Sequence, residues 1–455
     1  MRTAVVCANV PNPDSGGGAI TTWSVIAHLR ASGHAVSAVC IHGPVYDDAA
    51  GASLERRLRQ VRELGAEVVP VLSHAFVVPP RRVLARAVRT RDEELVPNLR
   101  DQGAVGEALN AIEPDAVFAY GWDAVAASRL ARAPRLGCVV DLAHLPPVFQ
   151  LRRALRRPTG GTVGRLALVQ AMLRRLPRLQ VELLNECAAS ADFARHHAEW
   201  LRRKGASGCL YLNTPVWDRV GPEWRAERDR LAAHELPRIL LIGHLSGTAT
   251  QDGLDFFLRD VLPRVERELG PDGFEVRLAG GFDPPPDLRA ALERSRVRAL
   301  GHLQDPDDEF KSADVLVVPT TVPLGARVRI VTGLSFGCPQ VIHVSNACGL
   351  AELEDGVNCL LGGTAGELAD GVVRTIRDRE LRRRLEDGGR AAYERWFALP
   401  VAGARIEAIL SSIARTGSHS WSTRTGPSDQ SPRANRGSST PSREPTTSNP
   451  IGPAT

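Results

Sequence analysis

Short apolar runs rich in β-branched residues alternate with longer segments of helical period along the first half of the chain. The chain opens with the run TAVVCANV, which a glycine-rich turn connects to the helical pattern AITTWSVIAHLRASG. The alternation continues with HAVSAVCI, SLERRLRQVRELG, AEVVPVL, DAVFAYG and LGCVVDLAH. Strands that alternate with helices of about 10–15 residues predict βαβ units and a parallel sheet.

A second series with the same order follows a charged segment, residues 222–237, which lacks strand signals. It reads RILLIGHL, the helical pattern LDFFLRDVLPRVEREL, and then EVRLAGG, VRALGHL, DVLVVPT, QVIHVS and NCLLGG. We therefore predict an α/β protein with two doubly wound domains. The predicted parts are a first domain over residues 1–220, a second over 221–399 and a closing helix over 400–415.

The end of the chain, residues 416–455, has a different composition, rich in Ser, Thr, Pro, Gly and Arg. Apart from Trp421 and Ile451 it offers almost no side chain to bury. Without apolar burial a segment does not offset the entropy lost on ordering, so we predict a disordered tail.

Composition and charge narrow the class of protein. The 455 residues include 43% hydrophobic and 24% charged positions, which is typical of a soluble globular protein. The net charge of +5 is small for this length and does not indicate a nucleic-acid binder.

None of the eight cysteines forms a CxxC pair, so we expect neither disulfides nor a zinc site. No run of about 18 apolar residues exists, and the first apolar run is too short for a secretory signal, so we expect a cytoplasmic protein.

Three consecutive glycines, Gly16 to Gly18, stand between the first predicted strand and its helix. Glycines at this point let a phosphate approach the backbone, and a helix N-terminus presents unpaired N–H groups and a partial positive charge. Gly17 and Gly18 are therefore candidate phosphate-binding residues. A simple tight turn is the alternative, since the spacing is not that of GxGxxG or of a P-loop.

A second candidate anion site lies in the segment PLGARVRIVTGLSFGCPQVI, where a helix is predicted over residues 327–336. Its first turn holds Arg327 and Arg329. Cations at a helix start are unfavourable for the helix dipole unless an anion binds there, so this placement indicates a ligand. The alternative is that the arginines only cover a surface.

These segments together resemble the retaining GT-B glycosyltransferases of the group 1, or GT4-like, family. The resemblance is strongest over residues 238–396, in ADVLVVPT, GARVRIVTGLSFGCPQVI and GLAELEDGVNCLL, and looser in PNPDSGGG, EWLRRKGA and YLNTPV. It implies two facing Rossmann-like domains, with a nucleotide-diphosphate sugar bound mostly by the second. It also implies an acceptor entering from the first domain, a last helix that packs back on the first domain, and no cofactor or metal.

The chain departs from the family at two positions. Members usually carry two glutamates eight residues apart, one near the donor sugar and one on the ribose hydroxyls. The matching positions here are Leu324 and Thr332. A threonine hydroxyl in place of a carboxylate would lose about 2 kcal/mol of donor affinity. Alternatively, the hydroxyl of Thr332 bonds to its own helix. A non-catalytic homologue that binds a nucleotide or glycan, and a GT-B sugar epimerase, therefore stay open beside a transferase.

The loop after the first strand of the second half departs as well. Family members carry an arginine and a lysine there that hold the diphosphate, whereas this chain reads GHLSGTATQDG. Gly243 and Ser246 could still offer backbone N–H and hydroxyl groups. Arg329 is then the expected cationic partner of the diphosphate.

Two groups of polar and aromatic residues follow strands of the first half. Asp141 and His144 come just after LGCVV and are the catalytic candidates, because ligands in open α/β sheets lie at the carboxyl ends of strands. Tyr120, Trp122 and Asp123 follow DAVFA and are the acceptor-binding candidates, since aromatic residues recognise sugars. Structural packing is the alternative for both groups.

Two charged clusters complete the candidates. Residues 151–180 hold eight arginines and an apolar stripe, which indicates either a solvated face or contact with an anionic inner membrane surface or lipid-linked acceptor. Asp307, Asp308 and Glu309 stand at a predicted helix start, where acids are expected without any metal.

Overall fold

The computed structural model describes most of residues 1–417. The residues left out are 15, 44–50, 74–91, 93–95, 143, 146–147, 150, 152–154, 156–161, 233 and 282, together with 418–455. The prediction of a disordered tail therefore lies outside the described residues, except for 416 and 417, where the last helix ends.

The first half forms a parallel sheet of seven strands in the order β3-β2-β1-β4-β5-β6-β7. Its strands are β1 (Arg2–Cys7), β2 (Ala35–His42), β3 (Glu67–Leu72), β4 (Ala116–Tyr120), β5 (Arg135–Val139), β6 (Ala189–Asp192) and β7 (Leu210–Tyr211). The flanking helices are α1 (Gly17–Ala31), α2 (Gly51–Glu63), α5 (Gln102–Ile112), α6 (Trp122–Ala127), α8 (Thr162–Asn185) and α9 (Arg195–Arg203). The order reverses between β1 and β4, as in a doubly wound fold.

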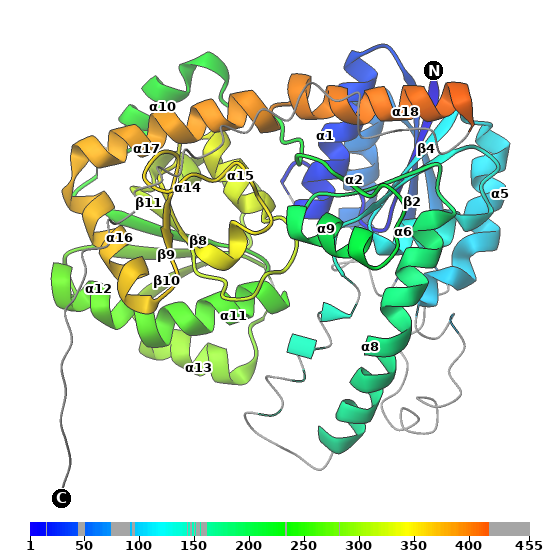
Figure 1. Cartoon of the computed structure of the whole chain (residues 1–455). Helices are drawn as coiled ribbons and strands as arrows, with labels where there is room; N and C mark the ends of the chain where they lie inside the picture. The colour runs from blue at the N-terminus through cyan, green and yellow to red at the C-terminus, as the bar shows by residue number, and fades with distance from the viewer. Residues whose placement is uncertain are drawn as a thin grey trace, which may run out of the picture. The chain divides into compact units, whose positions relative to one another are not determined.

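The second half repeats this plan with six parallel strands in the order β10-β9-β8-β11-β12-β13. They are β8 (Arg238–Ile242), β9 (Glu275–Ala279), β10 (Val297–Gly301), β11 (Val315–Val318), β12 (Gln340–His343) and β13 (Leu360–Gly362). The helices are α10 (Trp224–Leu231), α11 (Thr248–Phe256), α12 (Leu262–Leu269), α13 (Pro286–Arg294), α14 (Asp307–Ser312), α15 (Val328–Ser335), α16 (Ala365–Arg377) and α17 (Arg379–Ala392). Figure 1 shows the helices around this second sheet.

The predicted fold class is confirmed, because both sheets are parallel and each is wound in both directions. All strands named from the sequence are present in their predicted order. β6 and β7 were not predicted. The segment of β6, Ala189–Asp192, is made of Ala, Ser and Asp, which carry no strand signal, and β7 has only two residues.

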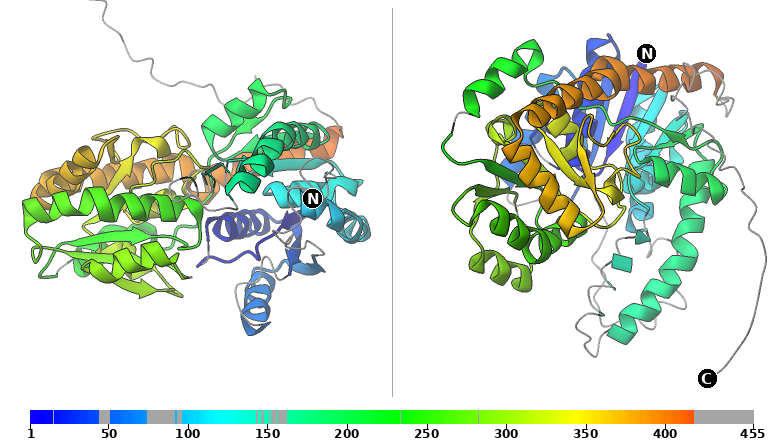
Figure 2. Two further views of the ribbon diagram at one scale, coloured as in Figure 1. Left: turned by 90° about the horizontal axis from the view of Figure 1, so that it is seen from below. Right: turned by 60° about the vertical axis from the view of Figure 1, so that its left-hand side comes forward.

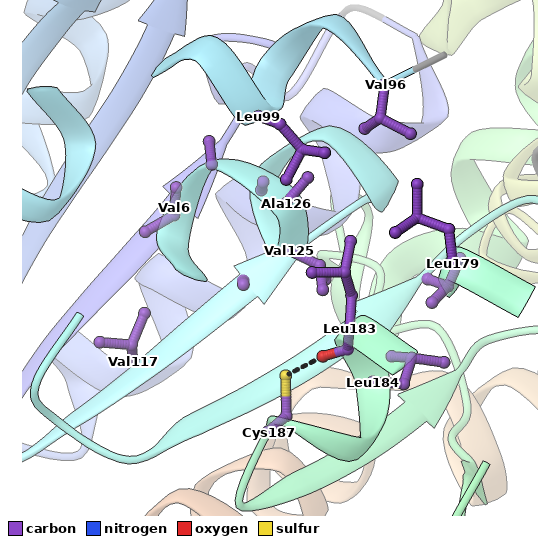
Figure 3. Packing of buried hydrophobic residues seen from close by; sticks show 14 of the residues in the cluster. Val6, Val96, Leu99, Val117, Val125, Ala126, Leu179, Leu183, Leu184 and Cys187 are labelled. Carbon is purple, nitrogen blue, oxygen red and sulfur yellow. Dashed lines mark hydrogen bonds between the residues drawn. The ribbon is translucent and has the colours of Figure 1, made fainter. Parts of the chain in front are cut away.

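Apolar side chains from helices and strands fill both faces of the first sheet. On one face, Val6 and Val117 of the sheet pack with Val125 of α6 and with Leu183 and Leu184 of α8 (Figure 3). The thiol of Cys187 donates to the carbonyl oxygen of Leu183 at 3.4 Å, so this cysteine caps α8 instead of pairing with another thiol. All eight cysteines are free.

The last helix, α18 (Ala404–Thr416), returns to the first sheet after α17 (Figures 1 and 2). Its Ile406, Ile409, Leu410 and Ile413 are buried with the core residues of the first domain. The carboxylate of Glu407 lies 2.8 Å from a ring nitrogen of both His28 and His34, which lowers the pKa of Glu407 despite its partial burial. Apolar packing and these polar contacts together hold α18 on the first domain.

Candidate functional site

One cavity of about 970 Å³ lies at the carboxyl ends of the strands of both sheets. Both sheets reverse their strand order beside it, between β1 and β4 and between β8 and β11, where ligands of open α/β sheets bind. The first domain supplies Pro13, Asp14, Gly16, Gly17, Gly18, Ile20, Trp23, Ser24, Arg56, Arg57, Tyr120, Val140 and Asp141. The segment that connects the two domains, between β7 and α10, supplies Val216, Trp217 and Arg219. The second domain supplies Ile242, Gly243, His244, Ala279, Gly280, Gly281, His302, Leu303, Gln304, Pro306, Phe310, Ala326, Arg327, Val328, Arg329 and Thr332.

Two helix N-termini meet at this cavity. A Cβ placed on Gly17, the first residue of α1, would lie 2.8 Å from Cγ2 of Val328, the first residue of α15. No acidic side chain stands in the first turn of either helix. Glycine is required because a larger residue would force the two helix ends apart. Both partial positive charges therefore point toward the same space.

Arg329 is fixed by the second sheet. One of its guanidinium nitrogens donates to the carbonyl oxygen of Ile242 at the end of β8, and another donates to Oγ1 of Thr250 at 2.9 Å. Gly243 makes this possible, since a Cβ there would collide with the guanidinium group. Burial, helped by the charge of Arg327, lowers the pKa of Arg329 to about 9. The guanidinium group of Arg329 is thus held in place, and its buried positive charge has no negative partner among the described residues.

Arg327 is the N-cap residue of α15 and faces Asp141 of the first domain. Its Nε is buried and has no hydrogen-bond partner among the described residues. Burial lowers the pKa of Arg327, and the charge of Asp141 opposes this shift. Burial raises the pKa of Asp141, and the positive charge of Arg327 opposes this increase. The structure thus brings together one catalytic candidate and both arginines.

Thr332 lines the cavity one helical turn after Arg329. Its Oγ1 is buried and, within the described part of the chain, accepts and donates no hydrogen bond. The alternative derived from the sequence, a bond to its own helix carbonyl, is therefore wrong. A buried hydroxyl without a partner in the protein is a group that a bound ligand would satisfy.

The other departure from the family, Leu324, lies in an apolar cluster. It is buried with Ala249 and Val322 against Leu145 and Phe149 of the first domain. An apolar contact between the domains thus occupies the place where the family resemblance puts a glutamate.

Two neighbouring histidines of α9 hold the loop that leads into α15. Nε2 of His197 accepts a hydrogen bond from the amide of Gly325 at 3.3 Å. The ring of His196 lies 3.1 Å from the carbonyl oxygen of Pro323 through its own Nε2. Burial lowers the pKa of His197 to about 4, so at neutral pH it is an uncharged acceptor. The first domain therefore helps to position the arginine-bearing segment of the second.

Several sequence candidates lie beside the cavity instead of on its wall. Ser246 is exposed and bonds to Nδ1 of His244 at 2.7 Å, and it is His244 that lines the cavity. His144 is not among the lining residues, and its ring packs on Trp200 with centroids 4.9 Å apart. Burial lowers the pKa of His144.

Of the three acceptor candidates, one lines the cavity and two do not. Tyr120 lines the cavity, packed between Phe118 and Phe193, and burial raises its pKa. Trp122 packs against the core of the first domain, and Asp123 is not among the lining residues either. Burial raises the pKa of Asp123 to about 6.

Residues that the sequence did not single out also line the cavity. Arg219, in the connection between the domains, pairs with Asp14 at 2.8 Å, with Asp305 at 3.2 Å and with Asp307 at 3.0 Å. These contacts occupy Asp307, and no group of His, Cys, Asp or Glu able to hold a metal occurs in the described ranges. Trp23, Arg56 and Arg57 lie in helices of ordinary pattern, so no sequence signal distinguished them.

The arginine-rich segment is described only in part. Arg152, Arg153, Arg156 and Arg157 lie outside the described residues. Arg174 and Arg178 of α8 are exposed, and Arg175 bonds to Asp92 at 2.6 Å. No described helix is both long enough and apolar enough to cross a membrane.

Two parallel, doubly wound domains that share a cavity at their carboxyl ends define the GT-B fold. Solved structures with this fold match nearly the whole chain at low identity. HepE of Anabaena in complex with UDP-glucose is 15% identical with a TM-score of 0.61, over 90% of this chain and 100% of that one. Sucrose-phosphate synthase of Thermosynechococcus elongatus is 14% identical with a TM-score of 0.62, over 91% of this chain and 99% of that one. Trehalose 6-phosphate synthase of Burkholderia multivorans is 13% identical with a TM-score of 0.57, over 92% and 100%.

Residues 236–378 match the family model described as glycosyl transferases group 1. The resemblance stated from the sequence is thereby confirmed for the second domain, and the solved structures show the fold of the whole described chain. No curated protein sequence matches the chain.

Proposed function

We propose that this chain transfers a glycosyl group from a nucleotide-diphosphate sugar to a hydroxyl group of an acceptor, with retention of the anomeric configuration. The observation that carries the proposal is the position of Arg329, fixed at a cavity where the N-termini of α1 and α15 converge. Arg327 beside it has an unpartnered Nε. This wall supplies what a departing diphosphate needs, which is fixed positive charge and free N–H donors.

The proposed reaction requires little covalent chemistry from the protein. The bond between the anomeric carbon and the diphosphate oxygen breaks, the acceptor oxygen forms a bond to the same face of that carbon, and the proton of the acceptor hydroxyl passes to the departing diphosphate. Arg329 and the backbone N–H groups near Gly17 and Gly18 stabilise the charge that develops on the diphosphate. Thr332 offers its unpartnered hydroxyl to the nucleotide ribose. Asp141, on the first-domain side of Arg327, faces the sugar and the acceptor hydroxyl.

The reaction proposed here uses no metal and no cofactor beyond the donor itself. Transfer would take place in the cytoplasm, with the acceptor entering from the first domain. Peripheral contact with the inner membrane surface is the further part of this proposal, supported by Leu166, Leu173, Arg174 and Arg178, which α8 leaves exposed. Co-sedimentation with vesicles containing phosphatidylglycerol tests it, and equal recovery with neutral vesicles would contradict it.

The test of the proposed function is donor cleavage. The protein is incubated with UDP-, GDP-, ADP- and TDP-sugars, and release of the nucleotide diphosphate is followed together with the anomeric configuration of the product by NMR. We expect one donor to be cleaved above background by the wild type, with retention, and not by Arg329→Ala. Cleavage that Arg329→Ala leaves unchanged would contradict the assigned role.

A binding protein without catalysis is the second candidate, favoured by the burial of Leu324 between the domains. It predicts that one of the nucleotide-sugars binds and is returned intact. A sugar epimerase would instead return the nucleotide-sugar with one inverted centre. The same NMR measurement separates all three outcomes.

A further inference from the structure

The cavity has a second basic group at its first-domain end, which the proposed donor does not use. Arg56 and Arg57 of α2 line the cavity, and neither forms an ion pair with any residue that the structure describes. The amide nitrogen of Asn12 donates to Oε1 of Gln60 at 2.7 Å and so fixes the face of α2 that carries Gln60. Residues three and four apart share a helix face, so Arg56 and Arg57 lie on the same side as Gln60.

The charges along the cavity wall are unbalanced. Five arginines line it, Arg56, Arg57, Arg219, Arg327 and Arg329, against two acids, Asp14 and Asp141. Arg219 neutralises Asp14 at 2.8 Å. Arg327 and Arg329 meet the two negative charges of the proposed donor diphosphate. Asp141 offsets part of the charge of Arg327, so one net positive charge remains on the wall, and the two guanidinium groups of α2 supply it for a second anion.

Two other first-domain side chains that line the same cavity suit a sugar. Trp23 of α1 lines the cavity and packs against the same apolar core as Leu54, which precedes Arg57 by three positions on α2. An indole ring beside a cavity offers a flat surface for the apolar face of a sugar ring. Ser24 lines the cavity as well, is fully buried, and its hydroxyl has no partner among the described residues. An aromatic surface and two guanidinium groups that line one cavity match a sugar that carries a phosphate.

We propose that the acceptor of this chain carries a phosphate, which Arg56 and Arg57 bind while the acceptor sugar lies against Trp23. The inference rests on the proposed function, because it assigns the first-domain end of the cavity to the acceptor. The arginine pair of the second domain then holds the donor diphosphate, and the arginine pair of the first domain holds the acceptor phosphate.

The test is a calorimetric titration with inorganic phosphate and with glucose 6-phosphate, with glucose as the uncharged control. It is run with UDP present and, separately, in Arg329→Ala, so that the second-domain anion site is filled or removed. We expect both phosphates to bind about tenfold more weakly to the double variant Arg56→Gln/Arg57→Gln than to the wild type. Arg59→Gln is the matched control, since Arg59 lies on the same helix, is exposed and does not line the cavity.

The outcomes separate this inference from the proposed function. No phosphate binding, or equal binding in the double variant and the wild type, would overturn the inference. A loss of UDP affinity in the double variant as large as its loss of phosphate affinity would overturn it too, because the arginines would then belong to the donor site. If none of UDP, GDP, ADP and TDP binds the wild type, the proposed function alone is contradicted, since phosphate binding is read independently in Arg329→Ala.

A second measurement, co-sedimentation with lipid vesicles, identifies the source of the phosphate. The vesicles consist of phosphatidylcholine and phosphatidylinositol. If the wild type sediments with them and the double variant does not, the phosphate belongs to a lipid headgroup. Equal sedimentation of the two proteins, together with the expected glucose 6-phosphate result, assigns it to a free phosphorylated sugar.

Discussion

The two arginine pairs of the cavity differ in how they are held. Arg329 donates to the carbonyl oxygen of Ile242 and to Thr250, and burial lowers its pKa to about 9. Arg56 and Arg57 extend from one face of α2, and no described residue pairs with either. Arg329 is fixed before any ligand arrives, whereas the side chains of Arg56 and Arg57 lose conformational freedom on binding.

This difference indicates two kinds of recognition. A fixed, poorly solvated cation gives strong stabilisation to charge that develops at one place, which is what a leaving diphosphate requires. An exposed cation contributes less, because water screens it and its side chain must be ordered, but it adapts to ligands of different shape. We therefore expect substitutions on the second-domain wall to have larger effects than those on the first.

The largest effect is expected for Arg329→Ala. Loss of two charge-assisted hydrogen bonds to the diphosphate would weaken donor binding by about 3 kcal/mol or more, roughly a hundredfold. Arg329→Lys restores charge without the fork of donors and should recover only part of the loss. Calorimetric affinity for the cognate donor measures both. A loss no larger than that of Arg56→Gln would contradict the proposed difference between the two walls.

The pH dependence of stability should depend on His197. Its pKa of about 4 in the folded protein lies below the ordinary value of 6.5, so the unfolded chain binds the proton first as pH falls. Stability from this group is therefore complete above pH ~6.5 and decreases as pH falls toward 4, by about 2 kcal/mol between 6.5 and 5.

Denaturant unfolding of the wild type and His197→Gln across this pH range measures the effect. Because other buried groups titrate too, the slope difference between the two proteins is the readout. We expect a shallower decrease in the variant, whose side chain stays neutral. Equal slopes would show that folding does not lower the pKa of His197.

The sequence predicted the architecture better than the site. The individual strands of a parallel sheet are encoded locally, because each is a short apolar run. Runs such as RILLIGHL and DVLVVPT therefore predict β8 and β11 directly. Arg329 was found because its place in a helix start is chemically unusual. Arg56 and Arg57 were missed because the pattern of α2 is that of any surface helix, and only the fold brings that face to the cavity. His144 has the right position in the chain, but tertiary packing directs its ring to Trp200.

A smaller effect is expected for Gly17→Ala. The added Cβ would meet Val328 at 2.8 Å and separate the two helix N-termini, so donor affinity should decrease about tenfold. Gly16→Ala is the control, because a Cβ there meets no atom within 4 Å. Val328→Ala in the Gly17→Ala background should restore most of the affinity. Failure of this rescue would show that the close approach of α1 and α15 is not what forms the site.

The smallest effect is expected for Thr332→Val. The hydroxyl has no partner within the described structure, so the thermal unfolding temperature should not fall. Donor affinity should decrease about threefold, since a neutral hydrogen bond to the ribose contributes modestly. Thr332→Glu should raise it, because a carboxylate accepts from both ribose hydroxyls. Unchanged affinity in both variants would place the nucleotide away from α15.

The most direct test of the account is a crystal structure of the protein with its cognate nucleotide-sugar. We expect diphosphate oxygens within about 3 Å of the Arg329 guanidinium and of the amide groups that begin α1 and α15. A diphosphate bound to Arg56 and Arg57 instead, with Arg329 still joined only to Ile242 and Thr250, would contradict it.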